Sequence, residues 1–164
     1  MRKVIDDPKA SWDPDLWAAI AAQGWMGAAI PEAYGGLGLG HLELCVIAEE
    51  LGRAVAPIPF ASTVYILAEA ILLAGSEAQK AALLPEIASG ARIGCVATSE
   101  GPGVTTDATL KATVVAGKLT GVKIPVTDGG IAHMGLVLAK EDGRPGLYLV
   151  DLTGPGVTRD GLET

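Results

Sequence analysis

Ile93-Gly-Cys-Val-Ala-Thr-Ser-Glu-Gly-Pro-Gly-Val-Thr-Thr-Asp107 is the stretch at which the pattern of the sequence changes. Residues before it show the spacing of helices, and residues after it form short runs separated by turns. The stretch begins as an apolar run, continues through Thr98, Ser99 and Glu100, and ends in a glycine-proline loop. This order fits a buried strand whose end offers donors to a small polar ligand. It also fits a strand and an ordinary turn, which is the favoured interpretation of the stretch taken alone because loops outnumber sites.

Four helices are predicted before residue 92, because apolar residues recur there at helical spacing. Asp13 is a suitable cap for the first helix, and Ser76 with Gln79 forms a capping box at the start of the fourth. The third helix is apolar nearly all round and should be the most buried. The four ranges are about 13–24, 41–55, 59–74 and 76–90.

Strands are predicted beyond Gly90, where turns such as Ala116-Gly117 and Glu141-Asp-Gly143 separate short apolar runs. The predicted strands are about 93–99, 109–115, 118–126, 134–139, 147–152 and 157–159. Closely spaced strands of this kind are typical of an antiparallel barrel or sandwich. Helices first and strands second therefore predict an α+β fold, with a helical bundle in residues 1–92 followed by an antiparallel β-barrel or sandwich domain in residues 93–164.

The composition excludes several classes of protein. Hydrophobic residues make up 49% of the 164 residues and charged residues 19%, which predicts a folded core rather than disorder. The net charge of -7 argues against a basic surface for nucleic acid. The longest apolar region, Phe60 to Ala74, contains Ser62, Thr63 and Glu69 and is too short and polar to span a bilayer.

The sequence also carries signals about the cellular compartment. The N-terminus turns acidic before an apolar core can form, so it is not predicted to be a secretory signal. Cys45 and Cys95 lie far apart among apolar neighbours, which predicts buried free thiols in a reducing compartment. We therefore expect a cytoplasmic protein with no membrane span.

Few motifs in the chain carry chemistry by themselves. The glycine-rich loop Tyr34-Gly-Gly-Leu-Gly-Leu-Gly40 lacks the preceding strand and the Gly-Lys-Ser/Thr ending of a phosphate-binding loop, so a connecting loop is predicted. Glu49 and Glu50 diverge by about 100° around a helix and do not converge on one proton. His41 and His133 lack the spacing of metal ligands. The residues alone predict only a binding surface made of Thr98–Glu100 and a second loop near Val126–Gly130.

Several segments together resemble the acyl-CoA dehydrogenase family, in the order in which that family has them. The first three match its N-terminal helical domain, and the last three match its middle β-domain. They are Leu16-Trp-Ala-Ala-Ile-Ala-Ala-Gln-Gly-Trp-Met-Gly-Ala-Ala-Ile-Pro-Glu-Ala-Tyr-Gly-Gly-Leu-Gly38, Glu49-Glu-Leu-Gly-Arg53, Gly75-Ser-Glu-Ala-Gln-Lys-Ala-Ala-Leu-Leu-Pro-Glu-Ile-Ala-Ser-Gly90, Ala97-Thr-Ser-Glu100, Leu119-Thr-Gly-Val-Lys123 and Gly154-Pro-Gly-Val157.

The resemblance implies a flavoprotein oxidoreductase of fatty acid or lipid catabolism. In this family FAD lies between the β-domain and a C-terminal helical domain. A carboxylate base removes the α-proton of an acyl-CoA thioester while the β-hydride passes to flavin N5. The implied partners are an acyl-CoA substrate, an electron-transfer acceptor, and further subunits in a homo- or hetero-oligomer.

The resemblance also implies a set of cofactor-binding residues. Thr98 and Ser99 match the segment that touches the flavin pyrimidine, and Thr127 matches the hydroxyl residue near N5. Thr105 or Thr106 falls where a serine helps to bind pyrophosphate or CoA. The full expected set is Thr98, Ser99, Glu100, Thr105, Thr106, Val126 and Thr127.

The chain also departs from the family pattern. It has Ser99-Glu-Gly followed by Val104-Thr-Thr-Asp107, and Pro125 occupies the position of a tryptophan that stacks on the flavin. It also ends before the C-terminal domain that carries the base, and its β-domain is expected to be incomplete. We therefore expect a truncated chain, without a catalytic residue of its own and inactive alone. Two alternatives remain: a non-catalytic partner subunit, and a flavin-dependent monooxygenase on the same fold.

Overall fold

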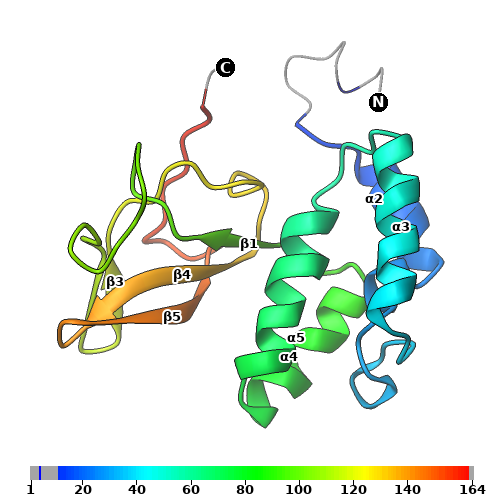
Figure 1. The fold of residues 1–164 in the computed structure, drawn as a ribbon, viewed down its shortest axis with the longest axis horizontal. Coiled ribbons are helices and arrows are strands. Elements are labelled where there is room, and N and C mark those ends of the chain that lie inside the picture. The colour runs from blue at the N-terminus through cyan, green and yellow to red at the C-terminus, as the bar shows by residue number, and fades with distance from the viewer. Residues whose placement is uncertain (1–3, 5–10, 163–164) are drawn as a thin grey trace. The chain divides into compact units, whose positions relative to one another are not determined.

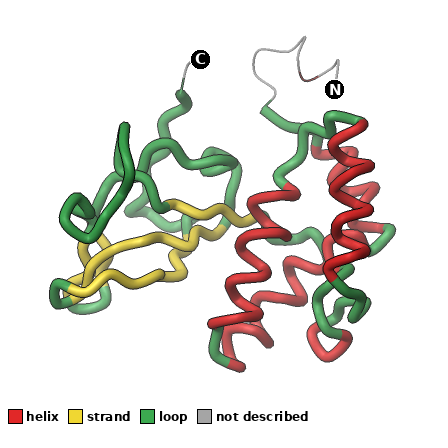
Figure 2. Tube along the Cα trace, in the orientation of Figure 1, coloured by secondary structure: helices red, strands yellow, loops and turns green. Residues whose placement is uncertain are grey.

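The structure is a computed structural model that describes residue 4 and residues 11–162. Its contacts divide the chain into two compact units, Met1–Arg92 and Ile93–Thr164. Figure 1 shows the helices in the first unit and the sheet in the second, and Figure 2 shows how much of the second unit consists of loops. The α+β organisation predicted from the sequence is confirmed.

Two helices of the helical unit, α2 and α5, begin at the predicted caps. The Asp13 side chain accepts a hydrogen bond from Leu16 N at 3.0 Å. Ser76 and Gln79 form the predicted reciprocal box, with Ser76 N to Gln79 Oε1 at 2.8 Å. The described helical elements are α2 (Pro14–Ala22), η1 (Trp25–Gly27), η2 (Glu32–Tyr34), α3 (His41–Arg53), η3 (Ala61–Ala68), α4 (Glu69–Ala74) and α5 (Glu77–Ala88).

The third predicted helix differs in its backbone. Residues Ala61–Ala68 are π-helical, and the α-helix α4 continues from Glu69. The expected burial is seen within η3, where Val64 and Leu67 are buried together with the hydroxyl side chains Ser62 and Thr63. The apolar run predicts a buried helix, but a segment that is apolar on nearly every side carries no period that separates a π-helix from an α-helix.

Close backbone contacts hold the helical unit together at its glycines. Trp17 Nε1 donates to Gly90 O at 2.8 Å, and a Cβ on Gly90 would lie only 2.8 Å from Ala21 Cβ. In the glycine-rich loop, Leu37 N donates to Gly27 O at 2.9 Å, and the amides of residues 38 and 39 also donate to carbonyls of residues 28–30. These amides are used internally, which supports a connecting loop rather than a phosphate cradle.

The sheet unit contains one open, mixed sheet in the described residues, rather than the predicted antiparallel barrel or sandwich. Its strands are β1 (Gly94–Ala97), β2 (Thr113–Val115), β3 (Lys118–Thr120), β4 (Met134–Glu141) and β5 (Arg144–Asp151). Both β1 and β2 pair with β4 in parallel, whereas β2–β3 and β4–β5 are antiparallel hairpins. Long connections separate β1 and β2 from β4, and such connections allow parallel pairing.

The hairpin turns follow the predicted turn residues. Ala116 and Gly117 have φ of 50° and 73°, and Asp142 and Gly143 have φ of 50° and 76°. Two consecutive left-handed residues give the turn whose twist suits a tight hairpin. The strand predicted at 157–159 is absent from the described residues, and the strand predicted at 118–126 ends at Thr120.

Burial corrects one further expectation. Cys95 in β1 is buried, and this burial raises the pKa of its thiol to about 11, with Arg159 opposing the shift and Asp128 adding to it. Cys45 in α3 is exposed, so the prediction of two buried thiols is wrong for Cys45. Leu44 is the buried residue of α3. Cys45 follows it directly and therefore lies about 100° further around the helix.

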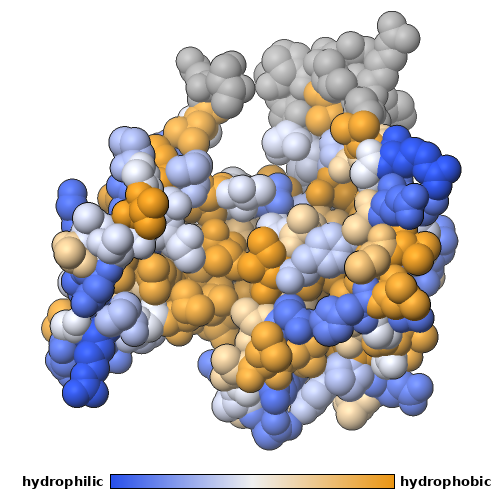
Figure 3. Space-filling view, in the orientation of Figure 1, coloured by the Kyte–Doolittle hydropathy of each residue, from blue (hydrophilic) through white to orange (hydrophobic). Residues whose placement is uncertain are grey.

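The surface of each unit exposes apolar side chains among polar ones (Figure 3). On α3, Leu42 is 75% exposed and Val46 57% exposed, whereas Leu44 is buried. None of the helices in the described ranges has the length and apolar character needed to cross a bilayer.

Candidate functional site

The end of β1 meets the segment around Ile124 through the backbone. Ile124 N donates to Ser99 O, and Gly101 N donates to Ile124 O, both at 2.9 Å. These two bonds form a parallel bridge between Glu100 and Ile124 that lies outside the named strands. The bridge therefore places Thr98–Glu100 beside Ile124, which lies two residues before the predicted loop near Val126–Gly130. That these two segments form one binding surface stays a prediction.

Glu100 has a different role from the one expected. Its Oε2 accepts from Lys111 N at 2.7 Å, and its Oε1 accepts from Ala112 N at 2.9 Å and from Lys123 Nζ at 2.7 Å. The side chains of Glu100 and Lys123 are only 9% and 8% exposed. Both carboxylate oxygens are thus engaged by the protein itself. A direct contact between Glu100 and a cofactor stays a prediction, and the observed contacts favour a supporting role.

The charge state of Glu100 follows from these contacts. Burial raises the pKa of the carboxyl, but the Lys123 hydrogen bond, the two amide hydrogen bonds and the positive charge of Lys123 together outweigh it. The net result is a pKa lowered to about 2. Glu100 is therefore ionised at neutral pH and is not suited to act as a general base.

The hydroxyls of Thr98 and Thr127 are available for a ligand. Both residues are exposed, and neither hydroxyl has a hydrogen-bond partner among residue 4 and residues 11–162. Ser99 is half-buried and uses its carbonyl in the bridge. Val126 is half-buried, and its carbonyl accepts from Gly129 N at 3.2 Å, which closes the turn after it.

The loop with Thr105 and Thr106 is held separately. Thr106 N donates to Thr109 Oγ1 at 2.8 Å, and Thr109 N donates to Thr106 Oγ1 at 3.3 Å. Lys140 Nζ, from β4, donates to Asp107 O and lies 3.2 Å from Asp107 Oδ1. Within the described ranges, no hydrogen bond joins Thr105 or Thr106 to Thr98, Ser99 or Thr127.

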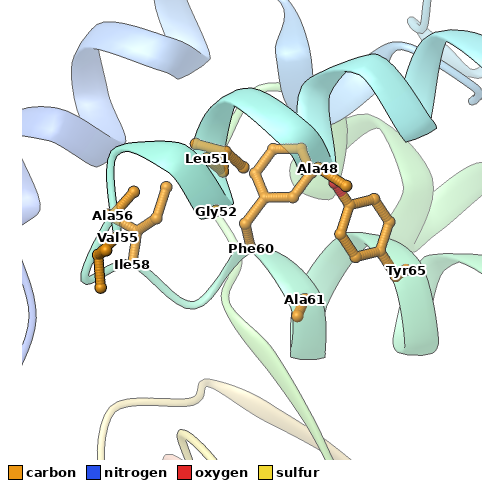
Figure 4. Close-up of a pocket in the computed structure, with 9 residues that line it drawn as sticks. All are labelled: Ala48, Leu51, Gly52, Val55, Ala56, Ile58, Phe60, Ala61 and Tyr65. Carbon is orange, nitrogen blue, oxygen red and sulfur yellow. The ribbon is translucent and has the colours of Figure 1, made fainter.

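Sequence reasoning missed two features. The first is Lys123, the ion-pair partner of Glu100. No role for Lys123 is predicted from the sequence, although it lies in a segment that resembles the family. The two residues are 23 positions apart, and no sequence pattern links a lysine to a carboxylate at that separation. The second is an open apolar pocket of about 300 Å³ in the helical unit. Figure 4 shows its lining, which comes from α3, the connection after it and the start of η3: Ala48, Leu51, Gly52, Val55, Ala56, Ile58, Phe60, Ala61 and Tyr65.

The pocket is defined by two aromatic rings. Phe60 and Tyr65 stand edge to face, with ring centroids 5.2 Å apart. The Tyr65 hydroxyl donates to Leu44 O at 3.3 Å, which ties η3 to α3. None of the described residues that line the pocket is charged, so it suits an apolar group rather than an ion.

Comparison with known proteins identifies the family. The family model described as acyl-CoA dehydrogenase, N-terminal domain, matches residues 2–91, which is more than half of the chain. The chain belongs to the acyl-CoA dehydrogenase family. A probable acyl-CoA dehydrogenase of Bacillus subtilis (strain 168) is 37% identical over 144 residues, covering 82% of this chain and 24% of the relative.

Similarity to solved structures extends over the sheet unit as well. The ChsE4-ChsE5 complex from Mycobacterium tuberculosis matches with a TM-score of 0.85 at 29% identity, over 98% of this chain and 44% of that chain. The acyl-CoA dehydrogenase complexed with FAD from Bacillus anthracis matches with a TM-score of 0.80 at 32% identity, over 92% and 28%. The chain thus spans less than half the length of these relatives.

Proposed function

We propose that this chain forms the helical and β portions of an FAD-dependent acyl-CoA dehydrogenase, which carries out α,β-dehydrogenation of an acyl-CoA thioester. The observation that supports this most directly is the bridge between Glu100 and Ile124, which joins the two segments expected at the flavin edge. The similarity to an acyl-CoA dehydrogenase solved with FAD supports the choice of cofactor.

The available donors fit the polar edge of a flavin. In the proposal Thr98 and Ser99 face the pyrimidine, Val126 and Thr127 lie near N5, and Thr105 or Thr106 serves the pyrophosphate or CoA. The hydroxyls of Thr98 and Thr127, which have no hydrogen-bond partner in the described part of the chain, support this assignment, since hydroxyls can both donate and accept at the ring atoms. FAD, when bound, supplies the hydride acceptor.

The remaining parts of the reaction need groups outside the proposed edge. No residue of this chain matches the family's base, and Glu100 is already committed to its internal contacts, so we expect no turnover from these 164 residues alone. In the proposal the whole enzyme acts in lipid catabolism in the cytoplasm and passes its electrons to a separate electron-transfer acceptor.

A second candidate function is that of a non-catalytic partner subunit. Pro125 supplies no aromatic ring where the resemblance places a stacking tryptophan, and this favours weak flavin binding. The similarity to chains of the ChsE4-ChsE5 complex fits a protein that works together with a different subunit. In either candidate, we propose an oligomer as the working form.

The visible spectrum of the purified protein separates the two candidates. A yellow protein with stoichiometric FAD supports the dehydrogenase, whereas a colourless protein that binds acyl-CoA thioesters supports the partner subunit. Thr98→Val combined with Thr127→Val should weaken FAD binding at least tenfold in a fluorescence titration. The Thr153→Val variant, on an exposed loop of the same unit, is the control.

A further inference from the structure

The Glu100–Lys123 ion pair connects three separate parts of the sheet unit. The Glu100 carboxylate lies just after β1, its two amide donors belong to Lys111 and Ala112 before β2, and Lys123 follows β3. Three donors at 2.7–2.9 Å leave the carboxylate little freedom to move. Removal of this one side chain would therefore release three connections at once.

The same ion pair sits against the proposed flavin edge. Glu100 directly follows Ser99, and Lys123 directly precedes Ile124. The backbone bonds from Ile124 N to Ser99 O and from Gly101 N to Ile124 O form an isolated bridge outside the named strands. The ion pair and the bridge together close a ring between the two segments, so each limits the movement of the other.

Stability alone does not account for this arrangement. A buried ion pair contributes little net stability compared with apolar side chains of similar volume, because both charges lose their hydration. An apolar contact between residues 100 and 123 would hold the segments together but would not fix their distance and direction. Charged hydrogen bonds fix both.

We propose that Glu100 and Lys123 are positioning residues that hold the Thr98–Gly101 segment in register with the Lys123–Thr127 segment, so that the hydroxyls of Thr98 and Thr127 are presented to one ligand. This inference rests on the proposed function for the identity of that ligand, FAD. In this proposal the two side chains act through the segments they hold: Lys123 Nζ donates to Glu100, and the Glu100 carboxylate also accepts from two backbone amides.

Amide exchange in the 164-residue protein without flavin tests the positioning role. Glu100→Gln with Lys123→Met removes both charges, and Glu100→Asp keeps the charge but shortens the reach. We expect the amides of Gly101 and Ile124 to exchange at least tenfold faster in both variants, while the amides of the β4–β5 hairpin change less. The control variant, Glu141→Gln with Lys118→Met, alters two exposed charges of the same unit. It should leave the exchange rates of the Gly101 and Ile124 amides unchanged. Equal acceleration throughout the sheet, or none at Gly101 and Ile124, would overturn the inference.

A titration with FAD, followed by quenching of flavin fluorescence, then separates the inference from the proposed function. If the wild-type chain binds FAD, the double variant should bind it at least tenfold more weakly, and the Glu141→Gln, Lys118→Met control should bind it equally well. Equal affinity of the double variant would contradict the positioning role. If the wild-type chain binds no FAD, the proposed function fails for this chain, and the exchange of Gly101 and Ile124 still decides whether the ion pair positions the segments.

Discussion

Two ion pairs in the sheet unit show how differently the same chemistry is used. Glu100 and Lys123 are nearly inaccessible, whereas Asp107 is 69% exposed and its partner Lys140 is 21% exposed. The first pair connects distant segments and engages two backbone amides, and the second fastens a loop that is otherwise held by local hydroxyl bonds. The comparison suggests that the Thr98–Gly101 segment is fixed before any ligand binds, while the Thr105–Thr109 loop can adapt to one.

The largest effect is expected for Lys123→Met. Loss of one partner leaves the Glu100 charge buried with only the two amides, and such a change lowers the free energy of unfolding by about 3–5 kcal/mol. Urea unfolding followed by amide exchange in β4 and β5 measures the sheet unit. The protein's three tryptophans, Trp12, Trp17 and Trp25, lie in the helical unit, so their emission reports that unit separately. If Lys123→Met lowers the free energy of unfolding by less than about 1 kcal/mol, the Glu100–Lys123 pair contributes no more than an exposed ion pair does.

At acid pH, the wild-type protein and Glu100→Gln should have the same free energy of unfolding. The pKa of Glu100 is lowered from 4.5 to about 2 in the folded protein, so the folded state holds the charged form more strongly than the unfolded state does. This contribution to stability is complete above about pH 4.5 and is lost as the pH falls toward 2. Urea midpoints at several pH values from 6 to 2.5 should converge for the two proteins. Parallel curves over that range would show that another group causes the acid sensitivity.

Much of the fold was predictable because its signals are local. Caps at Asp13 and Ser76 and the turn at Asp142-Gly143 depend on residues within four positions of one another, and the structure has all three. The direction of strand pairing was not predictable, since the alternation of a short strand is the same in parallel and antiparallel sheets. The π-helical backbone of Ala61–Ala68 was missed for a similar reason.

In the candidate site, too, only part of the arrangement was predictable from the sequence. The residues alone predict a surface made of Thr98–Glu100 and a loop near Val126–Gly130, and the backbone bridge at Ile124 lies just before that loop. The internal use of Glu100 depends on Lys123, 23 positions away, and on two backbone amides that no side-chain pattern reveals. Long-range polar contacts of this kind require the fold before they can be seen.

A smaller loss of stability is expected for Thr106→Val in the Thr105–Thr109 loop. The change removes the hydroxyl that accepts from Thr109 N while keeping the volume of the side chain. Because the site is exposed and water can replace the partner, the loss should be about 0.5–1 kcal/mol. Exchange of the Thr109 and Leu110 amides should rise, and exchange at Gly101 should not. A rise at Gly101 would show that the two loops are coupled and would weaken the distinction between them.

The smallest effect is expected for Asp107→Asn. Exposed ion pairs contribute about 0.2–1 kcal/mol, and Lys140 keeps its hydrogen bond to the Asp107 carbonyl after the substitution. The urea midpoint of the sheet unit should therefore shift far less than in Lys123→Met, and the small shift should vanish in 1 M salt, where exposed charges are screened within about 3 Å. A large and salt-resistant shift would mean that the Asp107 carboxylate supports this loop as firmly as Glu100 supports the other. The Thr105–Thr109 loop would then be preformed as well, and its ligand would have to fit it without rearrangement.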